Sequence, residues 1–243
     1  MPTGVQVYPN GLPHPPMQVR RRIALELLVL SALTSLYLIL VSPRPLAVDL
    51  GMALVGLGLV GFTADYTRTR IWGPPPDAEF NRRRRCAVNM FFSTGLAVSG
   101  VVLYGIFSAY AQHGNWDGVA ARFLNWHAPI ALVLYVPWAL LQQTLFQFYL
   151  LGRLRALLPF ASPLILSVMN GIAYGSVHLA VSPGRSGPDL ELAVLTMIGG
   201  AVWSYSYHRD RYVLPIAISH AVLGTTFYYW ARGSDVLLNF FGQ

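Results

Sequence analysis

The chain has 243 residues, of which 54% are hydrophobic and only 11% are charged. Soluble domains carry about a quarter charged residues, so this composition excludes an ordinary water-facing domain and predicts an integral membrane protein. All 17 basic residues are arginines, and we attribute the net charge of +7 to basic loops held on the cytoplasmic side of a membrane. We therefore expect membrane lipids as partners and no nucleic acid.

The predicted elements begin with a polar, proline-rich cytoplasmic tail over residues 1–22. A transmembrane helix needs about 20 mostly apolar residues, and seven later stretches meet this requirement. They are Ile23–Ser42, Leu46–Ala64, Cys86–Tyr110, His127–Leu151, Phe160–Val181, Leu190–His208 and Tyr212–Trp230. The sequence thus predicts an all-α, polytopic bundle, followed by an interfacial helix or tail over Ser234–Phe241.

The predicted loop Asp65–Arg85 contains three consecutive prolines and ends in four arginines, Arg82, Arg83, Arg84 and Arg85. Because proline disfavours helix, we expect a non-helical loop. Its four arginines would anchor the topology, and they are the candidate residues for binding anionic lipid or an acidic partner. The loop divides an N-terminal pair of spans, residues 23–85, from a membrane core, residues 86–243.

The distribution of arginines along the loops predicts the orientation of the chain. If the N-terminus is cytoplasmic, 13 of the 17 arginines fall on the cytoplasmic side. The positive-inside rule therefore places the N-terminus inside and the C-terminus outside. We expect the chain to reside in a bacterial cytoplasmic membrane.

Some polar residues near the span ends have structural interpretations. Glu26 lies one helical turn after Arg22 and can pair with it on the helix surface. Asp189 precedes the sixth span, where a carboxylate caps free backbone N–H groups. Cys86 opens the third span, and a buried, inert thiol is favoured over a palmitoylation site.

Strongly polar residues inside the last four spans are the functional candidates, because such residues are costly in a bilayer. They are Gln142, Gln143 and Gln147 in the fourth span, Asn170, Tyr174 and His178 in the fifth, and Ser219 and His220 in the seventh. Hydrogen bonds between such groups contribute roughly 0.6–2 kcal/mol each. A purely structural role is therefore one interpretation of this polar set.

The order and spacing of these residues resemble the motifs of the CPBP family, the CAAX protease and bacteriocin-processing (Abi-type) membrane proteins. The family motifs are Glu-Glu-x-x-x-Arg, Phe-x-x-x-His and His-x-x-x-Asn or Asp. The corresponding stretches here are Gln142-Gln143-x-x-x-Gln147, Tyr174-x-x-x-His178 and His220-x-x-x-Gly224. The resemblance covers about residues 128–230 and implies an all-helical intramembrane peptidase. In such an enzyme a glutamate activates water and hydrogen-bond donors stabilise the oxyanion.

The motif positions that would carry the chemistry are substituted in this chain. Glutamine replaces both glutamates and the arginine, and Gly224 replaces the asparagine or aspartate. A carboxamide has no basic oxygen at neutral pH, and loss of general-base catalysis costs about 10²–10⁴-fold in rate. The sequence therefore favours a catalytically silent CPBP-like protein that acts as a structural, binding or assembly subunit with a membrane protein partner.

Two alternatives stay open at this point. One is an active intramembrane endopeptidase that uses His178 and His220, and the other is a transporter or channel. No third metal ligand accompanies the two histidines in sequence, so we expect neither metal nor cofactor. Helical rise places His178 at a different depth from Gln142 and His220, and whether the three share a site is also open.

Overall fold

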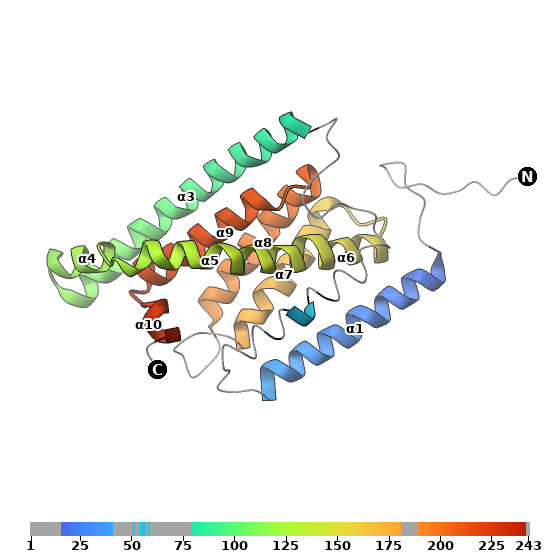
Figure 1. Cartoon of the computed structure of the whole chain (residues 1–243), viewed down its shortest axis with the longest axis horizontal. Helices are drawn as coiled ribbons and strands as arrows, with labels where there is room; N and C mark the ends of the chain where they lie inside the picture. Colours follow the sequence, from blue (N-terminus) through green and yellow to red (C-terminus); the bar gives the residue numbers. More distant parts are fainter. Residues whose placement is uncertain are drawn as a thin grey trace, which may run out of the picture. The chain divides into compact units, whose positions relative to one another are not determined.

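The computed structural model describes residues 16–40, 51, 54–56, 58, 79–180 and 189–241 (Figure 1). Every regular element among these residues is a helix, which confirms the all-α prediction. Two helical stretches, Phe80–His113 and Trp116–Leu157, are long and apolar enough to cross a membrane. The finer prediction of seven spans is not established by these two stretches and stays a prediction.

Six of the predicted spans coincide with helices. They correspond to α1 (Met17–Leu40), α3 (Glu79–His113), α5 (His127–Gln143) with η3 (Thr144–Leu150) and α6 (Leu151–Leu157), α7 (Pro163–Ala180), α8 (Leu190–Asp210), and α9 (Leu214–Thr226) with η4 (Phe227–Ala231). The elements η3 and η4 are π-helical turns. The predicted span Leu46–Ala64 lies mostly outside the described residues.

Two short helices complete the described elements. The helix α4 (Trp116–Phe123) precedes α5, and its N-cap Asn115 accepts a hydrogen bond from the backbone N–H of Gly118 at 2.8 Å. The helix α10 (Val236–Phe241) falls within the segment predicted as an interfacial helix or tail.

The basic run is helical, and the prediction of a non-helical loop up to its last arginine was wrong. The helix α3 begins at Glu79, so its first turns contain Arg82, Arg83, Arg84 and Arg85. The prolines end at Pro76, and the residues that follow include good helix formers such as alanine, glutamate and arginine. Residues 65–78, which include the three prolines, lie outside the described part of the chain.

The chain divides into two compact units, and each is described by itself. Unit 1 comprises Met1–Thr67, Phe146–Ser182 and Ser186–His208, and unit 2 comprises Arg68–Leu145, Pro183–Arg185 and Arg209–Gln243. In unit 2, α9 packs against both α3 and α5. In unit 1, α6 packs against α1 and α7.

Glycines on α7 allow α8 to approach closely within unit 1. A Cβ atom added at Gly171 would lie 2.5 Å from the carbonyl oxygen of Met197, and one at Gly175 would lie 2.5 Å from that of Ala193. Two glycines four residues apart present a flat face to a neighbouring helix, as is common where membrane helices pack. This close packing fixes the helix that carries Tyr174.

Glu26 connects α1 to η3 and α6. It accepts hydrogen bonds from the hydroxyl of Tyr149 and, at 3.1 Å, from the guanidinium of Arg153. These partners lie 123 and 127 residues away in sequence. The helix-surface interpretation of Glu26 therefore missed its tertiary role.

Asp235 holds α10 against the start of α5 in unit 2. Its carboxylate lies 2.5 Å from Nδ1 of His127 and accepts hydrogen bonds from Tyr229 at 2.9 Å and Asn125 at 3.2 Å. Burial alone would raise the pKa of Asp235. The hydrogen bonds from His127, the backbone N–H of Leu238, Asn125 and Tyr229 outweigh it and lower the pKa to about 2.

Candidate functional site

His220 on α9 is the centre of the polar cluster in unit 2. The Nε2 atom of Gln143, at the end of α5, lies 3.2 Å from Nδ1 of His220. The hydroxyl of Tyr135, two turns earlier on α5, lies 3.4 Å from Nε2 of His220, and the two rings meet edge to face at 5.4 Å. Both ring nitrogens of His220 therefore have a partner that carries no charge.

The position of the proton on the His220 ring follows from which neighbouring group donates a hydrogen bond to it. When the Gln143 amide donates to Nδ1 of His220, Nε2 carries the ring proton and donates to the oxygen of Tyr135. An imidazole in this state is neutral. A glutamate at position 143 could instead accept a hydrogen bond from Nδ1–H and stabilise the imidazolium form by its negative charge, which a carboxamide lacks.

The ring of Tyr135 fills the space beside Gly224, where the family motif has asparagine or aspartate. A Cβ atom added at Gly224 would lie 2.6 Å from Cε1 of Tyr135. Real side chains do not approach that closely, so a larger residue at position 224 requires the tyrosine ring to move. Glycine at position 224 therefore leaves room for the ring of Tyr135, whose hydroxyl lies next to His220.

One predicted motif position, Gln147, contacts a different set of residues in unit 1. The side chain of Asn170 donates hydrogen bonds to Oε1 of Gln147 at 3.2 Å and to the hydroxyl of Ser204 at 2.7 Å. Ser204 in turn donates to the carbonyl of Gly200. Gln147 therefore joins η3, α7 and α8 through neutral hydrogen bonds, in the position where the family has an arginine.

Tyr174 is buried in an aromatic cluster of unit 1. Its ring meets Phe146 at 4.4 Å, Trp203 at 5.9 Å and His178 at 6.0 Å, each edge to face. Such pairs contribute about 0.5–1.5 kcal/mol each beyond the burial of their area. A tyrosine at the phenylalanine position thus keeps the packing role of the aromatic ring.

The structure brings together some of the predicted site residues and leaves others in separate units. Gln142, Gln143, His220 and Gly224 belong to unit 2, whereas Gln147, Tyr174 and His178 belong to unit 1. The boundary falls inside η3, directly after Leu145. A site shared by His178, Gln142 and His220 therefore stays a prediction.

The four arginines predicted to bind lipid or a partner lie together at the start of α3 in unit 2. Arg82, Arg83, Arg84 and Arg85 are all exposed. The guanidinium of Arg83 lies over the ring of Tyr212, 5.4 Å from its centroid. Arg85 is different, because its charge is paired within the protein with Asp210. The helical run thus presents exposed positive charge, and its binding of lipid or a partner stays a prediction.

A comparison with family models identifies the segment that carries the motif residues. Residues 123–226 match the family described as type II CAAX prenyl endopeptidase Rce1-like. This segment is therefore similar to that family. The match contains every motif position from Gln142 to Gly224 and confirms the resemblance to the CPBP family, whose members are embedded in membranes. No curated protein and no solved structure matches the chain.

Sequence reasoning missed Tyr135, which makes the second contact to His220 in the Rce1-like segment. Tyr135 and Gln143 are eight residues apart on α5, which places both on one helix face after about two turns. This spacing could have identified the tyrosine. Its fit to Gly224 could not be found in this way, because that contact joins residues 89 positions apart.

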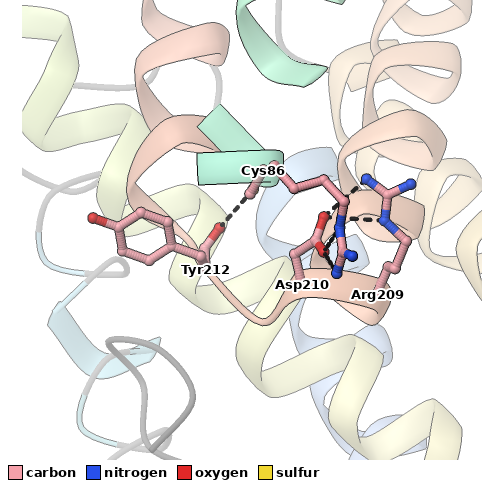
Figure 2. Close-up of polar contacts among 5 residues, drawn as sticks. Cys86, Arg209, Asp210 and Tyr212 are labelled. Atoms are coloured by element: carbon pink, nitrogen blue, oxygen red, sulfur yellow. Dashed lines mark hydrogen bonds and ion pairs between the residues drawn. The ribbon is translucent and has the colours of Figure 1, made fainter. Parts of the chain in front are cut away.

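Sequence reasoning also missed Asp210, which is the last residue of α8. Arg85 donates to its Oδ1 at 2.6 Å. Arg209 donates to its Oδ2 at 2.9 Å (Figure 2). Beside this pair the thiol of Cys86 contacts the carbonyl of Tyr212 at 3.7 Å (Figure 2). Cys86 is fully buried, which confirms its interpretation as a buried thiol.

The N-terminal cap predicted for the sixth span is confirmed. Oδ1 of Asp189 accepts a hydrogen bond from the backbone N–H of Leu192 at 3.1 Å, three residues into α8. The carboxylate thus satisfies a free donor at the helix start, as side chains at this position commonly do.

Proposed function

We propose that this chain is a non-catalytic Rce1-like membrane protein that serves as a binding or assembly subunit of a membrane protein complex. The observation that carries the proposal is the cluster around His220. Both ring nitrogens have uncharged partners, Gln143 and Tyr135. The tyrosine ring also occupies the space that a polar side chain at position 224 would need.

The chemistry of peptide hydrolysis argues for the non-catalytic half of the proposal. Water must lose a proton to a base as it attacks, and the carboxamides of Gln142 and Gln143 do not accept one at neutral pH. Loss of the base costs about 10²–10⁴-fold, and loss of one oxyanion donor costs about 10²–10³-fold. If the two losses multiply, the rate falls by about 10⁴–10⁷-fold.

The proposed binding role rests on the contacts between helices that remain after the motif residues are substituted. The contacts Gln143–His220 and Gln147–Asn170 hold helices together without a buried charge. Removing all the motif charges at once avoids an unpaired ion in the bilayer. A framework kept in this way can present a surface to a partner.

The basic turns of α3 supply one such surface in this proposal. With the N-terminus cytoplasmic, the exposed side chains of Arg82, Arg83 and Arg84 meet anionic headgroups or an acidic partner segment. Each arginine near an anionic membrane surface contributes about 1 kcal/mol of attraction. Arg85 contributes less to this surface, because it forms an ion pair with Asp210.

Purification of the full chain from its own membranes in mild detergent tests the binding half. We expect a second membrane protein to co-migrate at fixed stoichiometry and to be joined to the chain by cross-linking within intact membranes. A chain that migrates alone, with no cross-linked product, contradicts an assembly role.

One observation favours the alternative of an active endopeptidase. The Nδ1 atom of His178 is buried and has no hydrogen-bond partner among the residues that the structure describes. An imidazole nitrogen of this kind could accept a proton. Cleavage of a prenylated CAAX peptide that is lost in both His178→Ala and His220→Ala variants would support this alternative.

A further inference from the structure

Two arginines from distant parts of unit 2 share one buried carboxylate. Asp210 is fully buried, whereas the side chains of Arg85 and Arg209 are 49% and 42% exposed. Oδ1 of Asp210 accepts hydrogen bonds from Nε and Nη2 of Arg85 at 2.9 and 2.6 Å. Oδ2 accepts from the same two atoms of Arg209 at 3.1 and 2.9 Å (Figure 2). The carboxylate thus holds two guanidiniums side by side at the protein surface, and we call these three residues the arginine clamp.

Each guanidinium of the clamp keeps hydrogen-bond donors that the carboxylate does not use. A guanidinium has five N–H donors, and Asp210 accepts only from Nε and Nη2 of each arginine. Within the part of the chain that the structure describes, Nη1 of neither arginine makes a hydrogen bond. Two positive charges and one negative charge give the clamp a net charge of +1. It can therefore donate hydrogen bonds to one anion through groups that are already held in place.

Further contacts between the same two segments fix the position of the clamp. The thiol of Cys86, the residue after Arg85, donates to the carbonyl oxygen of Tyr212 at 3.7 Å (Figure 2). The guanidinium of Arg83 lies over the ring of the same tyrosine. The start of α3 is thus joined to the turn after α8 by more than the ion pairs of the clamp.

The exposed side chains that follow the clamp along each helix indicate its depth in the membrane. On α3, Phe91 and Phe92 are 75% and 69% exposed, and six residues of helix place Phe91 about 9 Å beyond Arg85. On α9, Leu214 and Ile218 are exposed. Such apolar surface suits contact with lipid hydrocarbon, and arginines at the ends of membrane helices reach the headgroups. We therefore expect the clamp at the level of the lipid phosphates.

We propose that the clamp binds the phosphate of one anionic glycerophospholipid, with Nη1 of Arg85 and Nη1 of Arg209 donating to its oxygens. Arginine suits this role because its rigid N–H fork matches the oxygens of a phosphate. A lipid is favoured over an acidic protein segment because the exposed apolar side chains beside the clamp can contact acyl chains. The inference rests on the proposed function, in which the basic turns of α3 face the cytoplasm, and it names the ligand of that surface.

Competition between two phospholipids with the same acyl chains tests the selection of an anionic headgroup. Phosphatidylglycerol carries a net negative charge, whereas phosphatidylcholine carries its own cation beside the phosphate. The full chain is equilibrated with both lipids in detergent, and retained lipid is identified by native mass spectrometry. We expect phosphatidylglycerol to be preferred by about 5-fold, as for one net positive charge near an anionic headgroup. Equal retention of the two lipids overturns the proposal.

Substitutions of arginine separate the clamp from general attraction to the basic run. Arg209→Gln should lose most of the preference. Arg84→Gln is the matched control, because it removes the same charge from an exposed side chain about 100° around α3 from Arg85. Arg209→Lys keeps the charge without the rigid fork, and its preference should also fall. Equal preference in Arg209→Gln and Arg84→Gln, or an unchanged preference in Arg209→Lys, overturns the proposal.

Soluble anions test whether the ligand is a lipid. Inorganic phosphate and a short polyglutamate peptide, each at the concentration of the lipid, should leave phosphatidylglycerol bound. Displacement by inorganic phosphate would assign the clamp to a free anion, and displacement by polyglutamate would assign it to an acidic partner; either result overturns the proposal. No partner protein takes part in these measurements. Their failure therefore overturns the lipid site alone, whereas failure of co-migration with a second membrane protein overturns the assembly role.

Discussion

The contact between Gly224 and Tyr135 gives a direct prediction of stability. In a Gly224→Ala variant the new Cβ would lie 2.6 Å from Cε1 of Tyr135, well inside normal contact distance. The tyrosine ring must then move, and its hydroxyl cannot keep its place near Nε2 of His220. Added volume in a packed core costs about 1–3 kcal/mol.

Gly95→Ala is the matched control for this substitution. Gly95 is also inside a helix, and an added Cβ would meet nothing within 4 Å. The control isolates the gain in helix propensity, about 1 kcal/mol for glycine to alanine. Relative to Gly95→Ala, we expect Gly224→Ala to be less stable by about 1–3 kcal/mol, or roughly 2–12 °C in unfolding temperature for a chain of this size.

Thermal unfolding in lipid nanodiscs measures this difference, and a double-mutant cycle tests its cause. Replacing Tyr135 by leucine removes the ring atom that opposes the new Cβ. Gly224→Ala should therefore cost less in the Tyr135→Leu background, with a coupling energy of about 0.5–3 kcal/mol. Equal unfolding temperatures for Gly224→Ala and Gly95→Ala, or a coupling energy of zero, would refute the packing argument.

Two further predictions concern acidic residues of unit 2. Asp210→Asn should lower the free energy of unfolding by about 1–3 kcal/mol, because it weakens the charge-assisted hydrogen bonds from Arg85. Asp117→Asn, at an exposed position, is the control. Equal unfolding temperatures for the two variants would contradict this prediction. The folded-state pKa of Asp235 is lowered from 3.8 to about 2. Its stabilisation is therefore complete above about pH 4 and is lost as the pH falls through about 2. The stability difference between the unmodified chain and Asp235→Asn should shrink over that interval, and a difference that stays constant would contradict the role of the carboxylate.

The helices could be predicted from the sequence because a long apolar segment in a membrane satisfies its backbone hydrogen bonds by forming a helix. α8 was predicted at its observed start, Leu190, and Asp189 was predicted as its cap. The start of α3 was predicted seven residues late, at Cys86 instead of Glu79. The apolar pattern begins only after the four arginines, and hydropathy does not detect a helix that extends beyond the hydrocarbon.

The candidate site was predicted only in part, because the motifs locate residues along the chain and do not identify their contacts. His220 and Gln143 were predicted as neighbours in function, and they lie 3.2 Å apart. Tyr135 carries no motif, and its importance depends on the packing of α5 against α9. The pairing of Arg85 with Asp210 also depends on contacts between residues 125 positions apart.

The central claim is that the neutral cluster around His220 does not catalyse peptide cleavage. Its most direct test is to reconstitute the full chain in nanodiscs with a prenylated CAAX peptide and to follow cleavage by mass spectrometry, with His220→Ala as the matched control. We expect equal product from the unmodified chain, from His220→Ala and from empty nanodiscs. Cleavage by the unmodified chain that His220→Ala abolishes while remaining folded would contradict the claim.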